Sequence, residues 1–168
     1  MELLSLERIL IDGLLFSLAF AVIVVGSLAY NARLWIQDYP AEIRALQAPL
    51  TLGEKREKAV LGAAFMVMLI GGFLLSGLGV EAANGGSAPF LTVFLHLWLV
   101  FNIVNLFDAV VLDWFMFLVL KPSFVYLPGS EAHMDAYRDP TMHIANYFKG
   151  VLIGAVISAI MAGIVVIL

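Results

Sequence analysis

The sequence contains no cysteine and unusually little charge. Only 13% of its 168 residues are Asp, Glu, Lys or Arg, against roughly 25% in soluble proteins, whereas 62% are hydrophobic. The absence of cysteine excludes disulfide bonds, thiol catalysis and thiolate metal sites. The Lys and Arg residues form no basic tract and the net charge is −4, so no nucleic-acid partner is expected. The composition instead predicts a protein of the cell membrane that has the lipid bilayer as its main partner.

Four apolar segments are long enough to cross a bilayer as helices. They span about residues 13–30, 59–79, 90–110 with an apolar extension to 120, and 148–168. The third, taken as one helix over 90–120, would be about 46 Å long in a hydrocarbon core of about 30 Å. It must therefore either tilt and protrude, or break near Asp108 so that 110–120 lies along the interface. We expect an all-α polytopic membrane protein, a single membrane domain over 1–168 built as a four-transmembrane-helix bundle with a long or broken third helix.

Basic residues are distributed unevenly among the three connections. Residues 31–58 contain five Lys or Arg, the loop 80–89 contains none, and the third connection contains Lys121 and Arg138, with Lys149 at its border. The positive-inside rule places Lys- and Arg-rich loops in the cytoplasm. We therefore expect loops 31–58 and 121–147 to be cytoplasmic and both termini to be outside.

A polar stripe runs along the apolar third span. At 100° per residue its members share one face about 140° wide. They are Trp98, Asn102, Asn105, Asp108 and Asp113. Because amides and carboxylates are costly in lipid, this face should turn toward other helices or toward a water-filled cavity, and ionisable residues there are candidate functional groups. We predict that these five residues bind a ligand.

Arg33 is a sixth candidate for the ligand site. It follows the first span at the level of the lipid headgroups, on the same predicted side as Asp108 and Asp113, where it could pair with them or with a phosphate. A structural alternative stays open, in which the two aspartates bind Arg33, Arg44 or Lys121 and only fasten the cytoplasmic loops.

The third connection contains donors that suit a divalent metal such as Zn²⁺ or Mn²⁺. The candidate ligands are His133, Asp135, Asp139 and His143, with Glu131 nearby. Their spacing matches no known ligand signature. Asp139 followed by Pro140 is also a helix start signal, which would place His143 in the first turn of the fourth helix. His96, on the opposite face of its span from the stripe, is expected to be a packed, hydrogen-bonded histidine.

Small residues recur every fourth position in the last span, at Gly150, Gly154, Ser158 and Ala162. Such stripes let helix backbones approach closely where the hydrophobic driving force is missing. They predict tight helix packing, either within the bundle or in a homodimer.

Three stretches carry a resemblance to other proteins: "YNARLWIQDYP", "FNIVNLFDAVVLDWFMFLVLKPSFVYLPGSE" and "HIANYFKGVLIG". They resemble a group of uncharacterised small bacterial integral membrane proteins with four spans. The resemblance implies the number of spans and no activity.

Three classes of function follow from these features. The first is a membrane protein, such as a transporter-like unit, that binds an ion or small molecule in a polar, carboxylate-containing cavity near its cytoplasmic side. Because four spans are few for a transport path, this class implies a dimer. The second is a membrane enzyme with an interfacial Asp/His site, with or without a divalent metal, acting on a lipid-like substrate. The third is an interaction subunit without its own chemistry.

Overall fold

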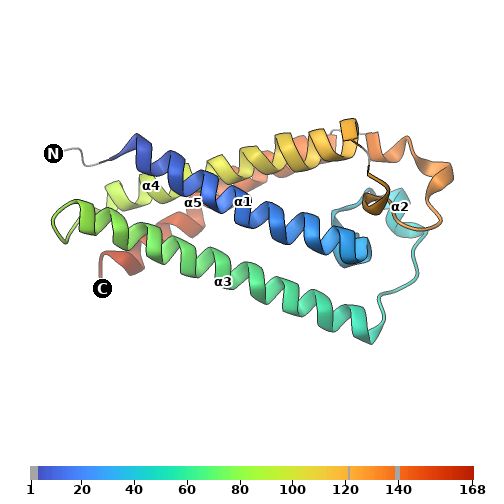
Figure 1. Ribbon diagram of the computed structural model, residues 1–168, viewed down its shortest axis with the longest axis horizontal. Helices are drawn as coiled ribbons and strands as arrows, with labels where there is room; N and C mark the ends of the chain where they lie inside the picture. Colours follow the sequence, from blue (N-terminus) through green and yellow to red (C-terminus); the bar gives the residue numbers. More distant parts are fainter. Residues whose placement is uncertain (1–3, 121, 139–140) are drawn as a thin grey trace.

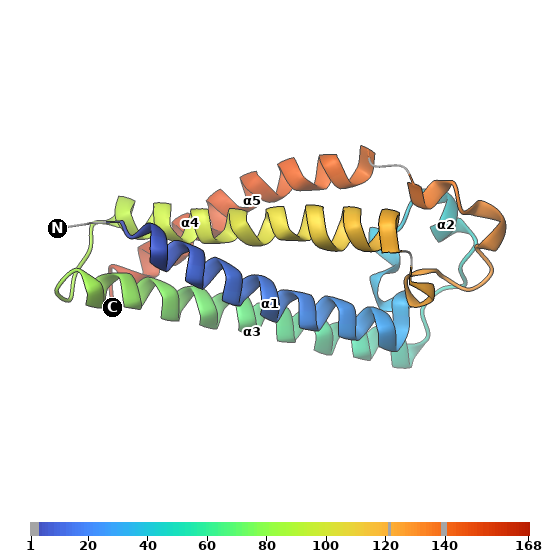
Figure 2. The same ribbon diagram turned by 45° about the horizontal axis from the view of Figure 1, so that its top comes forward.

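The computed structural model describes residues 4–120, 122–138 and 141–168, and within them the chain is all-α. The long helices are α1 (Leu6–Asn31), α3 (Leu52–Ala83), α4 (Phe90–Phe107), continued by the π-helix η2 (Asp108–Leu120), and α5 (Thr141–Val165). They lie side by side in an elongated bundle (Figures 1 and 2). The short elements are η1 (Ala32–Asp38), α2 (Ala41–Ala45), η3 (Ser123–Val125), η4 (Glu131–His133) and η5 (Ala136–Arg138).

Both termini and the turn between α3 and α4 lie at one end of the bundle, whereas the short elements gather at the other (Figure 1). We call the second end the capped end; it comprises residues 32–45 and 123–138. The connections 31–58 and 121–147, which the sequence assigns to one side of the membrane, thus meet at the same end. Gly85 and Gly86 form the opposite turn with φ of 83° and 96°, a conformation that residues with a Cβ rarely adopt.

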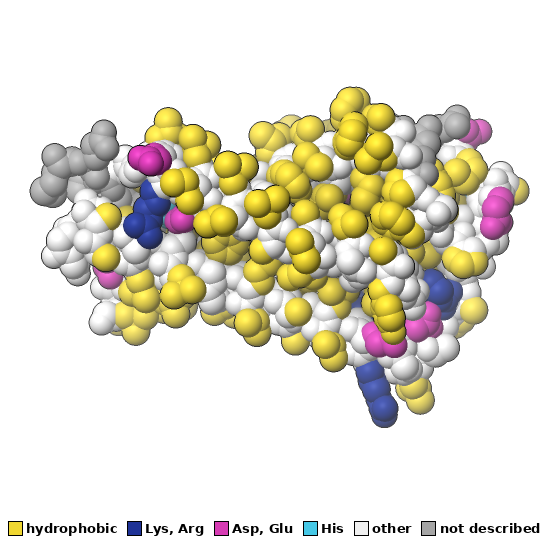
Figure 3. Space-filling view, viewed as in Figure 1, with side chains coloured by type: hydrophobic (Ala, Val, Ile, Leu, Met, Phe, Trp, Pro, Cys, Tyr) yellow, Lys and Arg dark blue, Asp and Glu magenta, His cyan; other side chains and the backbone are white. Residues whose placement is uncertain are grey.

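In the part of the chain that the structure describes, four helices are long and apolar enough to cross a membrane. Hydrophobic side chains cover the middle of the face seen in Figure 3, and charged side chains gather at its two ends. This distribution is the one expected of a multi-pass membrane protein, in which an apolar belt meets lipid and charged groups meet water. The predicted all-α four-helix bundle is therefore confirmed.

Local signals explain where the first helices begin. Ser5 caps α1 by accepting a hydrogen bond from the Arg8 N–H. Thr51 and Glu54 form a complete capping box at the start of α3, in which each side chain accepts a hydrogen bond from the other residue's backbone N–H. Both caps use a hydroxyl side chain, which is favoured at this position because it can accept a hydrogen bond from a backbone N–H of the first turn.

The third span does not break near Asp108. It continues without interruption from α4 into η2, and Asp108 is the residue at which the backbone changes from α-helical to π-helical hydrogen bonding. The segment 110–120 is therefore the wider end of one long helix, so the long form of the third helix is the one observed. π-Helices are rare and often mark functional sites.

The small-residue stripe of α5 faces α4 inside the same chain. A Cβ added to Gly154 would lie 2.7 Å from Cε1 of Phe101, and one added to Gly150 would overlap the Asn105 side chain. Ser158 and Ala162 are fully buried. The stripe thus packs α5 closely against α4. A homodimer through this face stays a prediction, and it would require α4 to move away from α5.

Candidate functional site: a carboxylate-lined cavity at the capped end

The capped end is held together by hydrogen bonds between segments far apart in the sequence. The Tyr39 hydroxyl donates to the Val125 carbonyl at 2.7 Å. The Tyr137 hydroxyl accepts from the Leu127 N–H at 3.1 Å and lies 2.8 Å from the Ser130 hydroxyl. Both phenol rings are buried and pack edge to face. These contacts fix η1 and residues 123–138 over the ends of α1 and η2.

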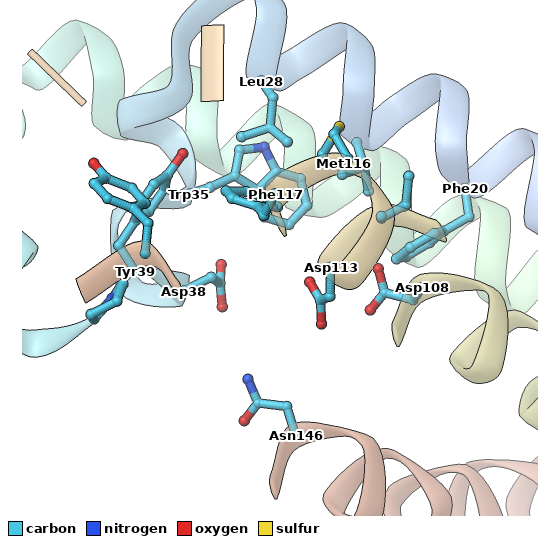
Figure 4. Close-up of a pocket in the computed structure, with 14 residues that line it drawn as sticks. Phe20, Leu28, Trp35, Asp38, Tyr39, Asp108, Asp113, Met116, Phe117 and Asn146 are labelled. Atoms are coloured by element: carbon cyan, nitrogen blue, oxygen red, sulfur yellow. The ribbon is translucent and has the colours of Figure 1, made fainter. Parts of the chain in front are cut away.

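Beneath this cap lies a cavity of about 150 Å³ between α1, η1, η2 and the first turns of α5. Its described lining is drawn in Figure 4 and combines apolar, aromatic and acidic side chains. The lining residues are Phe20, Val24, Leu28, Trp35, Asp38, Tyr39, Pro40, Asp108, Leu112, Asp113, Met116, Phe117, Tyr137 and Asn146.

One side of the cavity is apolar and fixed in place. Leu28, Leu112 and Met116 are buried in the hydrophobic core of the capped end. Above them, the indole N–H of Trp35 donates to the Ser27 hydroxyl at 2.9 Å, which holds the ring in position. Phe117 packs edge to face on Tyr39. The wall therefore offers rigid aromatic surface to whatever enters.

The other side carries carboxylates. Asp108 and Asp113 come from η2 and Asp38 from the end of η1, and in Figure 4 their carboxylates point into the same open space, with Asn146 across from Asp113. Asp38 and Asn146 are exposed and mark the mouth, whereas Asp108 and Asp113 are partly buried. Asp38 and Asp113 repel each other electrostatically. Three carboxylates therefore lie on this side of the cavity.

The π-helix explains why Asp108 and Asp113 lie together. In an α-helix, residues five apart are turned by about 140° from each other, so the two carboxylates would diverge. In a π-helix the hydrogen bond joins residues five apart, so positions 108 and 113 lie one turn above the other. The change of helix type at Asp108 thus brings both carboxylates to the cavity.

Among the described residues, the cations that act on this cavity lie outside its lining. The described lining contains neither Lys nor Arg. Lys58 and Arg44 attract the Asp38 carboxylate from outside, and Gln37 donates a hydrogen bond to it at 2.9 Å. The cavity lining itself is therefore complementary to a cation.

The acidic side chains are too dispersed for one metal ion. Within residues 4–120, 122–138 and 141–168, no group of three His, Asp or Glu is close enough to hold a metal. The three carboxylates of the lining therefore do not form such a group. A cation of several atoms, which can face more than one carboxylate at once, suits this arrangement better than a bare divalent ion.

Tyr39 is a neutral hydrogen-bond donor in the cavity wall. Burial raises the pKa of its phenol well above the usual value, and the neighbouring Tyr137 and Asp38 raise it further. The hydroxyl therefore keeps its proton and its bond to Val125 at physiological pH.

The structure separates the predicted stripe into two groups. Asp108 and Asp113 line the cavity. The other three side chains bind backbone carbonyls: Trp98 donates to Val151 at 3.3 Å, Asn105 to Tyr147 at 3.0 Å, and Asn102 to Trp98 in its own helix at 2.7 Å. Trp98 and Asn105 thus attach α4 to α5, and a ligand-binding role for these three residues stays a prediction.

Arg33 is placed beside α3 rather than in the cavity. Its Nε donates to Oε1 of Glu54 at 2.6 Å, and its other nitrogens reach Gln47 and the Ala48 carbonyl at 3.0 Å. These contacts fasten the 46–51 connection to the bundle. None of these hydrogen bonds joins Arg33 to a carboxylate of the cavity, and its ligand-binding role stays a prediction.

The predicted metal ligands are only partly described. His133 and Asp135 are exposed on the cap, Asp139 lies outside the described residues, and nothing is described of the His143 side chain. The metal site therefore stays a prediction.

Sequence reasoning missed the part of the cavity that comes from η1. Asp38, Trp35 and Tyr39 were not among the residues that the sequence predicted to bind a ligand. The available signal was the concentration of aromatic and acidic residues in "LWIQDYP" directly after a span. Asn146 had no distinguishing signal.

Comparisons with family models, curated proteins and solved structures found no match to this chain.

Proposed function

We propose that this protein binds a small organic cation in the cavity at its capped end and serves as a transporter-like unit for it. The observation that carries the proposal is the pairing of carboxylates from two elements with a rigid aromatic wall around one cavity that has no Lys or Arg in its described lining. Carboxylates attract an ammonium group, and aromatic faces stabilise it by cation–π interaction.

The position of the cavity supports a role in moving the cation rather than in changing it. The positive-inside rule assigns the capped end to the cytoplasm, so the mouth at Asp38 and Asn146 would open to that side. Phe20, Val24 and Leu28 of the first span extend the wall toward the membrane interior. Transporter sites commonly place ionisable groups at such helix junctions.

Calorimetric titration of the purified protein in dodecylmaltoside tests the proposal, with choline as the probe cation. Its neutral isostere 3,3-dimethylbutan-1-ol is the control ligand, because it has the same shape without the charge. We expect saturable binding of choline and much weaker binding of the alcohol. Equal binding of the two, or no binding of choline up to millimolar concentrations, would contradict the proposal.

The matched variants are Asp113→Asn and Glu42→Gln. Glu42 is exposed on α2 at the same end, outside the described lining. Loss of a charge-assisted contact costs roughly 1.5–3 kcal/mol, so Asp113→Asn should weaken choline binding about 10- to 100-fold. Glu42→Gln should leave it unchanged, and an equal loss in both variants would indicate a general effect of surface charge.

A further inference from the structure

A second polar cluster lies inside the bundle, toward the end that holds the chain termini. Three spanning helices each contribute one group to it: Asp12 of α1, Ser76 of α3 and His96 of α4. The Ser76 hydroxyl donates to Oδ2 of Asp12 at 2.5 Å. Nε2 of His96 lies 3.1 Å from the same carboxylate oxygen and 2.9 Å from the Ser76 hydroxyl. His96 is 1% exposed, so the expectation of a packed, hydrogen-bonded histidine is confirmed.

The hydrogen bonds determine where the imidazole carries its hydrogen. Ser76 has one hydroxyl hydrogen and gives it to Asp12. The contacts of His96 with the carboxylate and with the serine oxygen are then both favourable only if Nε2 carries a hydrogen and donates it. The second ring nitrogen, Nδ1, is therefore the position at which His96 would take up a further proton.

The cluster is not a nucleophilic catalytic triad, although it contains a serine, a histidine and an aspartate. In a triad, the histidine faces the serine with one ring nitrogen and the aspartate with the other. Here the same nitrogen faces both groups. Ser76 and His96 both donate hydrogen bonds to the Asp12 carboxylate, so neither ring nitrogen of His96 is placed to accept the serine proton as a base.

The charged groups around His96 come from α1. Arg8 lies one turn before Asp12, and its Nε is 3.7 Å from Oδ2 of Asp12. The guanidinium lies against Gly79 of α3, where a Cβ would overlap it. From α3 the contact is the neutral Ser76, and α5 contributes Met161 and Val165 to the adjoining core. When His96 is neutral, the positive charge of Arg8 and the negative charge of Asp12 give the cluster a net charge of zero.

We propose that Asp12 and His96 form an intramembrane proton-binding site, independent of the cation cavity. On proton uptake, a hydronium ion gives its proton to Nδ1 of His96 and is left as water, while Nε2–H stays bound to Asp12. The bond between a neutral imidazole and a carboxylate thereby becomes an imidazolium–carboxylate pair between α1 and α4. Buried pairs of this kind form the proton relays of membrane pumps and transporters.

The cluster has access to water from one side. The side chain of Asp12 is 18% exposed and that of Arg8 is 35% exposed, whereas His96 lies behind them. In Figure 3 the end of the molecule that carries the chain termini shows Lys or Arg side chains beside Asp or Glu side chains. Asp12 and Arg8 therefore form the exposed edge of the cluster, and His96 its buried part.

The test is nitrogen-15 NMR of the histidine rings in dodecylmaltoside between pH 4 and 9. The chain has 3 histidines, so His133→Gln/His143→Gln leaves one ring signal, from His96. We expect this signal to titrate between the Nε2–H form and the doubly protonated form. In an added Asp12→Asn substitution, the midpoint should fall by about one pH unit or more, because the carboxylate that stabilises the imidazolium is gone.

Ser158→Ala is the matched control for folding. Ser158 is fully buried in α5, and its hydroxyl has no hydrogen-bond partner among the described residues, so its removal should leave the midpoint unchanged. A His96 ring that keeps one protonation state throughout, or that titrates identically after Asp12→Asn, would overturn the proposal. Ser76→Ala, which retains the aspartate, provides a second variant: it should shift the midpoint less than Asp12→Asn does, and a larger shift would also contradict the assigned role of the carboxylate.

Discussion

At the scale of single residues, Tyr39 connects the cap to the cavity. Its ring forms part of the cavity wall, its hydroxyl binds Val125 of the opposite connection, and both are buried. Asp38 precedes it at the mouth. The same two consecutive residues thus provide one carboxylate at the mouth of the cavity and one anchor for the cap.

The raised pKa of Tyr39 predicts how stability depends on alkaline pH. The phenol keeps its proton in the folded protein, whereas in the unfolded chain it titrates near its ordinary value of about 10. Its contribution is therefore complete below pH 10 and is lost as pH rises further toward the folded value. Thermal unfolding between pH 8 and 11 should show a steeper loss above pH 10 in the wild type than in Tyr39→Phe. Parallel curves would contradict this role.

At pH 8, Tyr39→Phe should itself be less stable than the wild type by about 0.5–1.5 kcal/mol, because the hydrogen bond to Val125 is removed. Tyr30→Phe is the control, since Tyr30 is exposed and its hydroxyl makes a solvent-exposed hydrogen bond to Glu57. An equal loss in both variants would indicate no special role for the buried phenol.

At the scale of elements, the decisive feature is the change from α4 to η2 at Asp108. If the helix stayed α-helical, Asp108 and Asp113 would be about 140° apart, at the two edges of the predicted stripe. In the π-helix both face it.

This geometry predicts that Asp108→Asn and Asp113→Asn each weaken choline binding by similar factors. The double variant should lose less than the product of the two factors, because both carboxylates act on one cation. Titration calorimetry of the two single variants and the double variant checks this. A loss in only one single variant would contradict the shared position of the two carboxylates in the cavity.

The contact between α4 and α5 predicts a difference between two glycines of one helix. Gly154→Ala should lower the stability by about 1–3 kcal/mol, because the added methyl group meets Phe101. Gly163→Ala should be neutral, since a Cβ at Gly163 meets no atom of the described chain within 4 Å. Thermal unfolding in dodecylmaltoside measures both. Equal effects would mean that α5 does not pack on α4 as described.

At the scale of the whole molecule, hydropathy was enough to predict the four spans and the all-α bundle, because each span is a long apolar run between polar connections. The inward turn of Asp108 and Asp113 followed from the cost of carboxylates in lipid. The predicted stripe, however, assumed one helical period throughout, and periodicity gives no warning of a π-helix. It also could not show that Asn105 and Trp98 bind α5.

The remaining part of the site depends on contacts between distant segments. Asp38 and Asn146 are 108 positions apart in the sequence, and no local pattern joins them. The partners of Arg33 were likewise decided by the fold of the first connection, where Glu54 and Gln47 are closer than the aspartates of η2. Asp12, Ser76 and His96 meet for the same reason, through the packing of three helices.

The most direct test of the account is whether a bound cation is sensed by Trp35. The variant Trp98→Phe/Trp114→Phe leaves Trp35 as the single tryptophan, and its ring lines the cavity. Its fluorescence should change during titration with choline along the same saturation curve as the heat of binding. The change should be absent with 3,3-dimethylbutan-1-ol and shifted to higher choline concentration by Asp113→Asn. Saturable heat of choline binding with no change in Trp35 emission would place the cation elsewhere and contradict the assignment of this cavity.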